Sequence, residues 1–65
     1  MRPPTDPEVV RAVTADLKAF GYNGVTEEQV KAEITDALAG KETSVIGMVA
    51  VDMLKKAGLW QEEKA

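Results

Sequence analysis

Apolar side chains recur along the chain at the three- and four-residue spacing of an amphipathic helix. Three segments show this spacing, at about residues 7–20, 26–39 and 44–57. The apolar positions of the first segment are Val9, Val10, Val13, Leu17 and Phe20. Those of the second and third are Val30, Ile34, Ala37 and Leu38, then Ile46, Val49, Ala50, Met53, Leu54 and Ala57. No segment alternates with the two-residue period of a strand, so the pattern predicts an all-α fold.

Each segment is bounded by residues that favour the ends of helices. The capping residues that precede the segments are Asp6, Thr26 and either Thr43 or Ser44. The glycines that follow them are Gly21, Gly40 and Gly58. The sequence therefore predicts a compact three-helix bundle that forms a single domain over residues 1–65. Its loops are expected to be short, and residues 1–5 and 61–65 to be flexible.

Two of the glycines carry a further expectation about packing. After a helix-ending glycine, the next residue commonly packs on the residue four before the glycine. Tyr22 is therefore expected to contact Leu17, and Leu59 to contact Leu54.

The residue types of this chain allow few kinds of functional site. A chain of 65 residues has a marginal core, because it hides only ~60% of the surface that it exposes when unfolded. It contains no Cys and no His, which excludes disulfides, thiolate metal sites and histidine acid–base chemistry. No trio of acids has the spacing of a calcium loop, and no Ser or Lys has an evident base beside it. We therefore expect no enzymatic activity, no metal and no cofactor.

The charge and hydropathy of the chain bear on its partners and its compartment. The net charge is −3 and the basic residues are scattered, unlike the positive patch of a nucleic-acid-binding protein. No apolar run approaches the ~20 residues that span a bilayer, so no membrane association is expected. The chain begins with Met and lacks an apolar leader, which favours a complete cytoplasmic product.

The third segment is apolar nearly all round, and such a helix is expected to be buried on more than one side. Met48 and Val51 project away from its main apolar face, with Gly47 and Lys55 flanking them. Either this helix is the central core helix, or these residues form a surface for a second copy of the chain or another protein. A glycine inside a helix costs ~1 kcal/mol relative to alanine. That cost indicates close packing against Gly47, from inside the fold or from outside.

Two aromatic residues are further candidates for a protein contact. Trp60 lies just beyond the last helix, where it either covers the end of the core or stays exposed as an anchor for a partner. Tyr22 has the same two possible roles. In the covering role its ring lies over Leu17 and its hydroxyl reaches water. We favour the covering role for both residues.

The short connection at residues 40–43 raises a second hypothesis, a helix-turn-helix-like regulator that binds nucleic acid. A recognition helix presents Arg, Lys, Asn, Gln or Ser near its N-terminal end, where these side chains reach base edges. Residues 44–48 read Ser-Val-Ile-Gly-Met and have almost nothing to donate. Nucleic acid is therefore disfavoured as a partner.

Parts of the sequence resemble ubiquitin-associated domains. The relevant stretches are Leu-Lys-Ala-Phe-Gly-Tyr at residues 17–22, a helix ending in Ala-Leu at 37–38 and a helix ending in Met-Leu at 53–54. Those domains are three-helix modules in which a Met-Gly-Phe/Tyr loop and the last helix bind a partner, and Phe20 stands where they have Met. The resemblance implies a similar helix arrangement, with Phe20, Gly21, Tyr22 and Leu54 near any binding surface. It does not imply ubiquitin as the ligand.

The chain also resembles small uncharacterised proteins of actinobacterial phages, especially mycobacteriophages. The stretches that carry this resemblance are residues 6–10, 21–22, 26–30 and 56–59. It implies a small accessory protein that acts in the host cytoplasm and binds a host or phage protein. The sequence as a whole thus favours a non-enzymatic protein-interaction module. Homodimerisation through the third helix, centred on Met48, Val51 and Gly47, is one form of this hypothesis.

Overall fold

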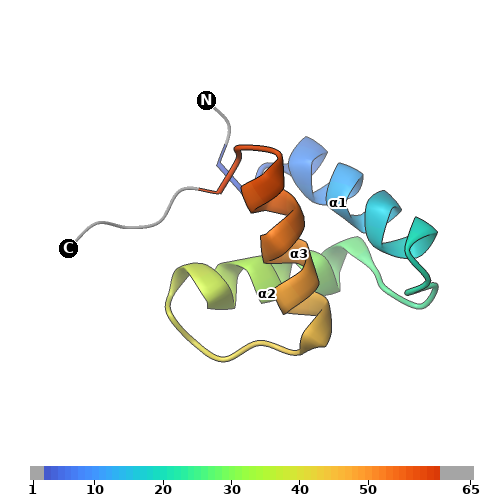
Figure 1. Cartoon of the computed structure of the whole chain (residues 1–65). Coiled ribbons are helices and arrows are strands. Elements are labelled where there is room, and N and C mark those ends of the chain that lie inside the picture. The colour runs from blue at the N-terminus through green and yellow to red at the C-terminus, as the bar shows by residue number, and fades with distance from the viewer. Residues whose placement is uncertain (1–2, 61–65) are drawn as a thin grey trace.

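The computed structural model describes residues 3–60, and these form three helices in chain order (Figure 1). Helix α1 spans Pro7–Ala19, α2 spans Glu27–Leu38 and α3 spans Val45–Lys56. The predicted all-α three-helix fold is confirmed, and each helix end lies within one residue of its expected position. Every pair of helices is in contact, with α2 running crosswise to α3.

The first two helices begin through the side chains that their sequences supply. Oδ1 of Asp6 accepts a hydrogen bond of 2.9 Å from the backbone N–H of Glu8. Oγ1 of Thr26 accepts one of 3.1 Å from the backbone N–H of Gln29. Each bond satisfies one of the N–H groups that a helix leaves free in its first turn. Ser44 caps α3, but its own side chain makes no such bond.

The helix ends follow the expected glycine geometry. Gly21 has a φ of 117°, in the left-handed region that a residue without Cβ reaches at low cost. The chain then turns back, and the N–H of Tyr22 donates to the carbonyl of Leu17 over 3.0 Å. Helix α3 ends in the same way, with a bond of 2.9 Å from the N–H of Leu59 to the carbonyl of Leu54. Tyr22 and Leu59 both pack against the buried core, which includes their predicted contacts Leu17 and Leu54.

The core lies where the three helices meet, and each helix contributes a fully buried aliphatic side chain. Leu17 of α1, Ile34 of α2 and Leu54 of α3 are at most 1% exposed. Burial of a side chain of this size stabilises the fold by about 1.5–3 kcal/mol. The other buried apolar residues are Val9, Val10, Val13, Val25, Val30 and Ala50.

Phe20 departs from the predicted core. The helical spacing placed it on the apolar face of the first helix, but 70% of its surface is exposed, so that prediction is wrong. Phe20 is the C-cap residue of α1, and the turn at Gly21 brings Tyr22 back onto the core. The Phe20 ring stacks on Tyr22 instead, with 6.2 Å between ring centroids and 17° between ring planes.

Residues 3–6, directly before α1, form a turn. The N–H of Asp6 donates to the carbonyl of Pro3 over 3.0 Å, and this turn holds Pro4 in a buried position. Residues 3–5 belong to this turn, and the flexibility predicted for residues 1–5 stays a prediction. Prolines at 3, 4 and 7 restrict the backbone here, which favours a defined turn. The flexibility predicted for residues 1–2 and 61–65 concerns positions outside the described residues.

Candidate protein-interaction surface

Two large apolar side chains are exposed together at the beginning of α3. Val45 is 61% exposed and Met48 is 63% exposed. Residues three apart are neighbours on the surface of a helix, so the two side chains adjoin. Val51, three residues after Met48, is half-buried, and Lys55, seven residues after Met48, is exposed. We call Val45, Met48, Val51 and Lys55 the α3 face.

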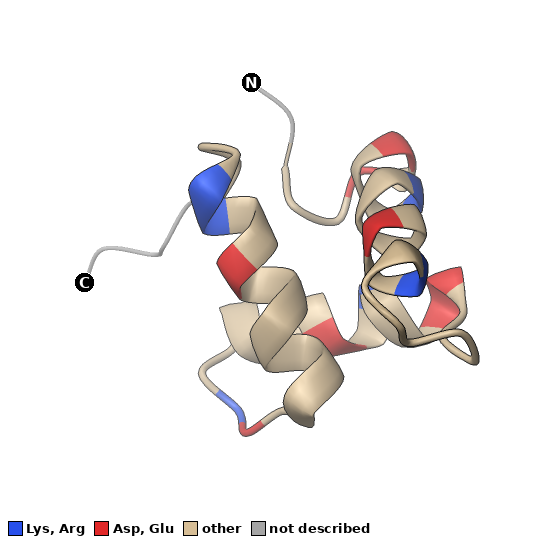
Figure 2. Ribbon diagram, turned by 45° about the vertical axis from the view of Figure 1, so that its right-hand side comes forward, with Lys and Arg blue, Asp and Glu red and all other residues tan. Residues whose placement is uncertain are grey.

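The α3 face begins within a stretch that carries no charge. Residues 43–51 contain no acidic or basic side chain, and Figure 2 shows this half of α3 without either colour. The charges of α3 come later, where Lys56 pairs with Asp52, four residues before it, over 3.4 Å. This ion pair is well exposed, so it contributes little to stability. Within α3 itself, charged side chains therefore follow the apolar half of the face only on its C-terminal side.

Gly47 is buried and does not belong to the α3 face. A Cβ built on Gly47 would lie 2.6 Å from Oε1 of Glu33 and 2.6 Å from Cβ of Thr43. Both distances are far below van der Waals contact. The structure therefore accounts for this glycine from inside the fold, where α2 and the α2–α3 loop pack closely against it.

Glu33 of α2 explains why this close packing exists. Its Oε1 accepts a hydrogen bond of 3.1 Å from the N–H of Ser44, and its Oε2 accepts one of 2.9 Å from the Ser44 hydroxyl. Glutamate three residues after the N-cap often binds the N-cap N–H in this way. That position of α3 is Gly47, which has no side chain, so a carboxylate from α2 takes the role. Sequence analysis did not identify Glu33; the missing acid at position 47 is the signal that could have prompted a search for it.

The two aromatic candidates both lie just beyond the end of a helix. Tyr22 follows α1 and is half-buried against the core. Trp60 follows α3 and is also half-buried against the core, as the covering role predicted. The Nε1 of Trp60 is buried and has no hydrogen-bond partner within residues 3–60. Of the residues proposed from the sequence, Met48, Val51 and Lys55 share one side of α3, whereas Gly47 is buried and Tyr22 and Trp60 lie beyond the ends of helices.

Residues 3–60 also bear on metal binding and on insertion into a membrane. This part of the chain contains no group of three or more acidic, His or Cys side chains placed to hold a metal ion. Its helices are also too short or too polar for any of them to cross a bilayer.

Comparisons with known protein families, with curated proteins and with solved structures found no match for this chain. The resemblances to ubiquitin-associated domains and to phage proteins therefore stay predictions. What the fold and the surface define is a small all-α domain with an exposed apolar face on its third helix.

Proposed function

We propose that this chain is a non-enzymatic protein-interaction module that binds its partner through the α3 face. The observation that carries the proposal is the exposure of Val45 and Met48 side by side in an uncharged stretch. Single exposed apolar residues are common on protein surfaces, whereas adjoining ones with a polar border are typical of contact surfaces. Methionine is also enriched in such surfaces.

The α3 face suits a contact of modest affinity. Full burial of a side chain of this size contributes about 1.5–3 kcal/mol, and about 60% of each side chain is available to a partner. Val45 and Met48 together would thus contribute about 2–4 kcal/mol. Association costs at least as much in lost freedom, so the contact also needs Val51 and the neighbouring surface. A charge placed at the centre of the face should abolish binding.

The partner is either a second copy of the chain or another protein in the cytoplasm, of the host or of a phage. Light scattering over a concentration series tests the first form. Homodimerisation predicts a dimer mass for the wild type and a monomer mass for Met48→Asp and Val45→Asp. The matched control is Ala15→Asp, which adds the same charge at an exposed position of α1 and should stay dimeric. A monomeric wild type would contradict homodimerisation.

The second form is tested by capture from an extract of the cells that produce the chain. A partner of the α3 face should be retained by the wild type and by Ala15→Asp, and lost with Met48→Asp. Circular dichroism must show all three chains equally helical. Capture that does not depend on Met48 would contradict a binding role for this face.

The alternative is a helix-turn-helix-like regulator that binds nucleic acid. The geometry at the beginning of α3 gives it little support, because the Ser44 hydroxyl is already bonded to Glu33. A recognition helix needs free polar side chains there. Fluorescence anisotropy with duplex DNA at low salt separates the two functions. Tight, salt-sensitive binding would favour the regulator and contradict the proposal.

A further inference from the structure

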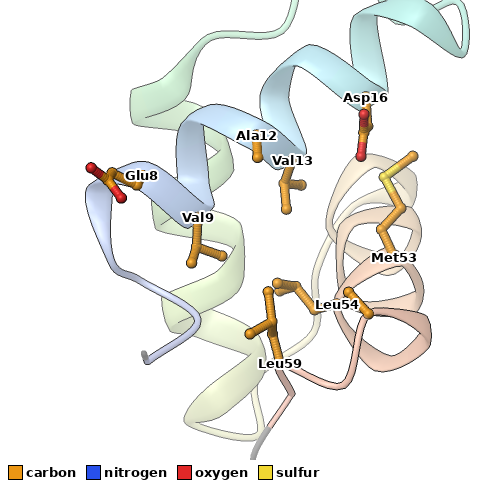
Figure 3. Close-up of a pocket in the computed structure, with 9 residues that line it drawn as sticks. Glu8, Val9, Ala12, Val13, Asp16, Met53, Leu54 and Leu59 are labelled. Carbon is orange, nitrogen blue, oxygen red and sulfur yellow. The ribbon is translucent and has the colours of Figure 1, made fainter. Parts of the chain in front are cut away.

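A groove of about 370 Å³ lies between α1 and α3, and Met48 is not among the residues that line it (Figure 3). Val9 and Val13 of α1 and Leu54 of α3 point into it, and Leu59 closes it from beyond the end of α3. Ala12 and Ala57 also line it, and their small side chains leave the space between the two helices open. The groove is therefore an apolar trough with one helix along each wall.

The ionisable side chains of the groove are all acidic. Asp16 of α1 and Met53 of α3 extend toward each other across one end (Figure 3). Glu8 also lines the groove, but in this view its carboxylate points away from the space between the helices. None of the nine lining residues is Lys or Arg. Because the chain also has a net charge of −3, the groove favours a ligand with an apolar body and a positive group near Asp16.

The apolar surface of α3 continues beyond the groove. Val49 and Val45 precede Met53 by four and eight residues, and this spacing keeps all three on one side of the helix. Val49 is half-buried and Val45 is exposed. From Val45 to Ala57 the apolar track is about 18 Å long, at 1.5 Å per residue. An apolar surface of this length, continuous with the groove between α1 and α3, fits an elongated partner better than a compact small molecule.

We propose that the groove between α1 and α3 is a docking site for a basic amphipathic helix of another protein. The apolar side chains of that helix enter the trough, as in other helix-in-groove complexes. A Lys or Arg of the incoming helix pairs with Asp16. The site is distinct from Met48, although both surfaces include Val45.

The test uses synthetic peptides of about fourteen residues, or about four helical turns. The probe has Leu at the i, i+3, i+4 and i+7 positions and Lys elsewhere. One control peptide has Glu in place of every Lys, and another has the probe composition in scrambled order. Amide chemical shifts of the isotope-labelled protein then locate the binding surface. We expect the basic probe to shift amides of α1 and of the C-terminal half of α3, and the acidic peptide to shift neither.

Variants of the protein decide whether the groove and its charge carry this binding. Ala12→Lys is at an exposed position of α1 and places a positive charge on the groove, so it should weaken probe binding at least about tenfold. Asp16→Asn should weaken it about three- to fivefold, the effect of one exposed ion pair. Glu42→Gln removes the same charge from the exposed α2–α3 loop and should change nothing. Met48→Asp should bind as the wild type does, which separates this site from the one under Proposed function.

Three results would overturn the proposal. The first is that the acidic or the scrambled peptide binds as tightly as the basic probe. The second is that the shifts map outside the groove. The third is that Asp16→Asn and Glu42→Gln weaken binding equally, which would mean that only the net charge of the protein matters.

Discussion

Replacement of Gly47 by alanine should destabilise this protein, contrary to the usual effect of that change inside a helix. Alanine is ordinarily favoured over glycine by ~1 kcal/mol at a helical position. Here the added Cβ would lie 2.6 Å from Glu33 Oε1 and 2.6 Å from Thr43 Cβ. Carbon and oxygen atoms pack at about 3.5 Å or more, so the neighbours must move by nearly 1 Å.

The size of the effect follows from what must move. Overpacking of this kind costs about 1–3 kcal/mol. Displacing Glu33 also weakens its two hydrogen bonds to Ser44, which hold the beginning of α3 against α2. These bonds lie at an exposed position, so we take ~1 kcal/mol for both together. After the gain in helix propensity is subtracted, the net loss in the free energy of unfolding is about 1–3 kcal/mol. In a domain of this size, that corresponds to a fall in Tm of roughly 4–24 °C.

Urea and thermal unfolding followed by circular dichroism measure this loss. Gly24→Ala is the matched control, because nothing lies within 4 Å of a Cβ at that position, and it should be neutral or slightly stabilising. In a Glu33→Ala background the penalty of Gly47→Ala should shrink but persist, since Thr43 stays in place. A Gly47→Ala protein as stable as the wild type, or more so, would refute the close packing of α2 on α3.

Two further substitutions test the boundary of the core. Leu54→Ala removes a side chain that is 1% exposed and should cost about 2–5 kcal/mol in urea unfolding, so a loss below about 1 kcal/mol would contradict its central position. Phe20→Ser changes a side chain that is 70% exposed and should alter stability by no more than about 0.5 kcal/mol. A loss of stability above about 1.5 kcal/mol would instead support the core position that the helical spacing predicted for Phe20.

The parts of the fold that could be predicted from the sequence are those that depend on neighbouring residues. A capping side chain such as Asp6 or Thr26 acts within its own helix, and Gly21 needs only its own backbone freedom to end one. The error at Phe20 arose because helical spacing assigns a face even where the helix is about to end. Glu33 and Ser44 are 11 residues apart, so their contact depends on how α2 crosses α3.

The candidate surface could be predicted only in part, for the same reason. The excess of apolar residues on the third helix is visible in the sequence, and it pointed to Met48 and Val51. Which of them stays exposed depends on how the helices pack, and this packing half-buries Val51 while leaving Met48 open. It also leaves Val45 exposed and opens the groove between α1 and α3. Neither feature follows from the spacing within one helix.

The central claim is that the α3 face contacts another polypeptide, and site-specific photo-crosslinking tests it most directly. A photoreactive amino acid replaces Met48 in one protein and Ala15 in another, and both are irradiated in the cells that produce them. The account predicts a defined crosslinked product from position 48, whether with a second copy or with a different protein, and none from position 15. The absence of any product from position 48, or equal products from both positions, would contradict it.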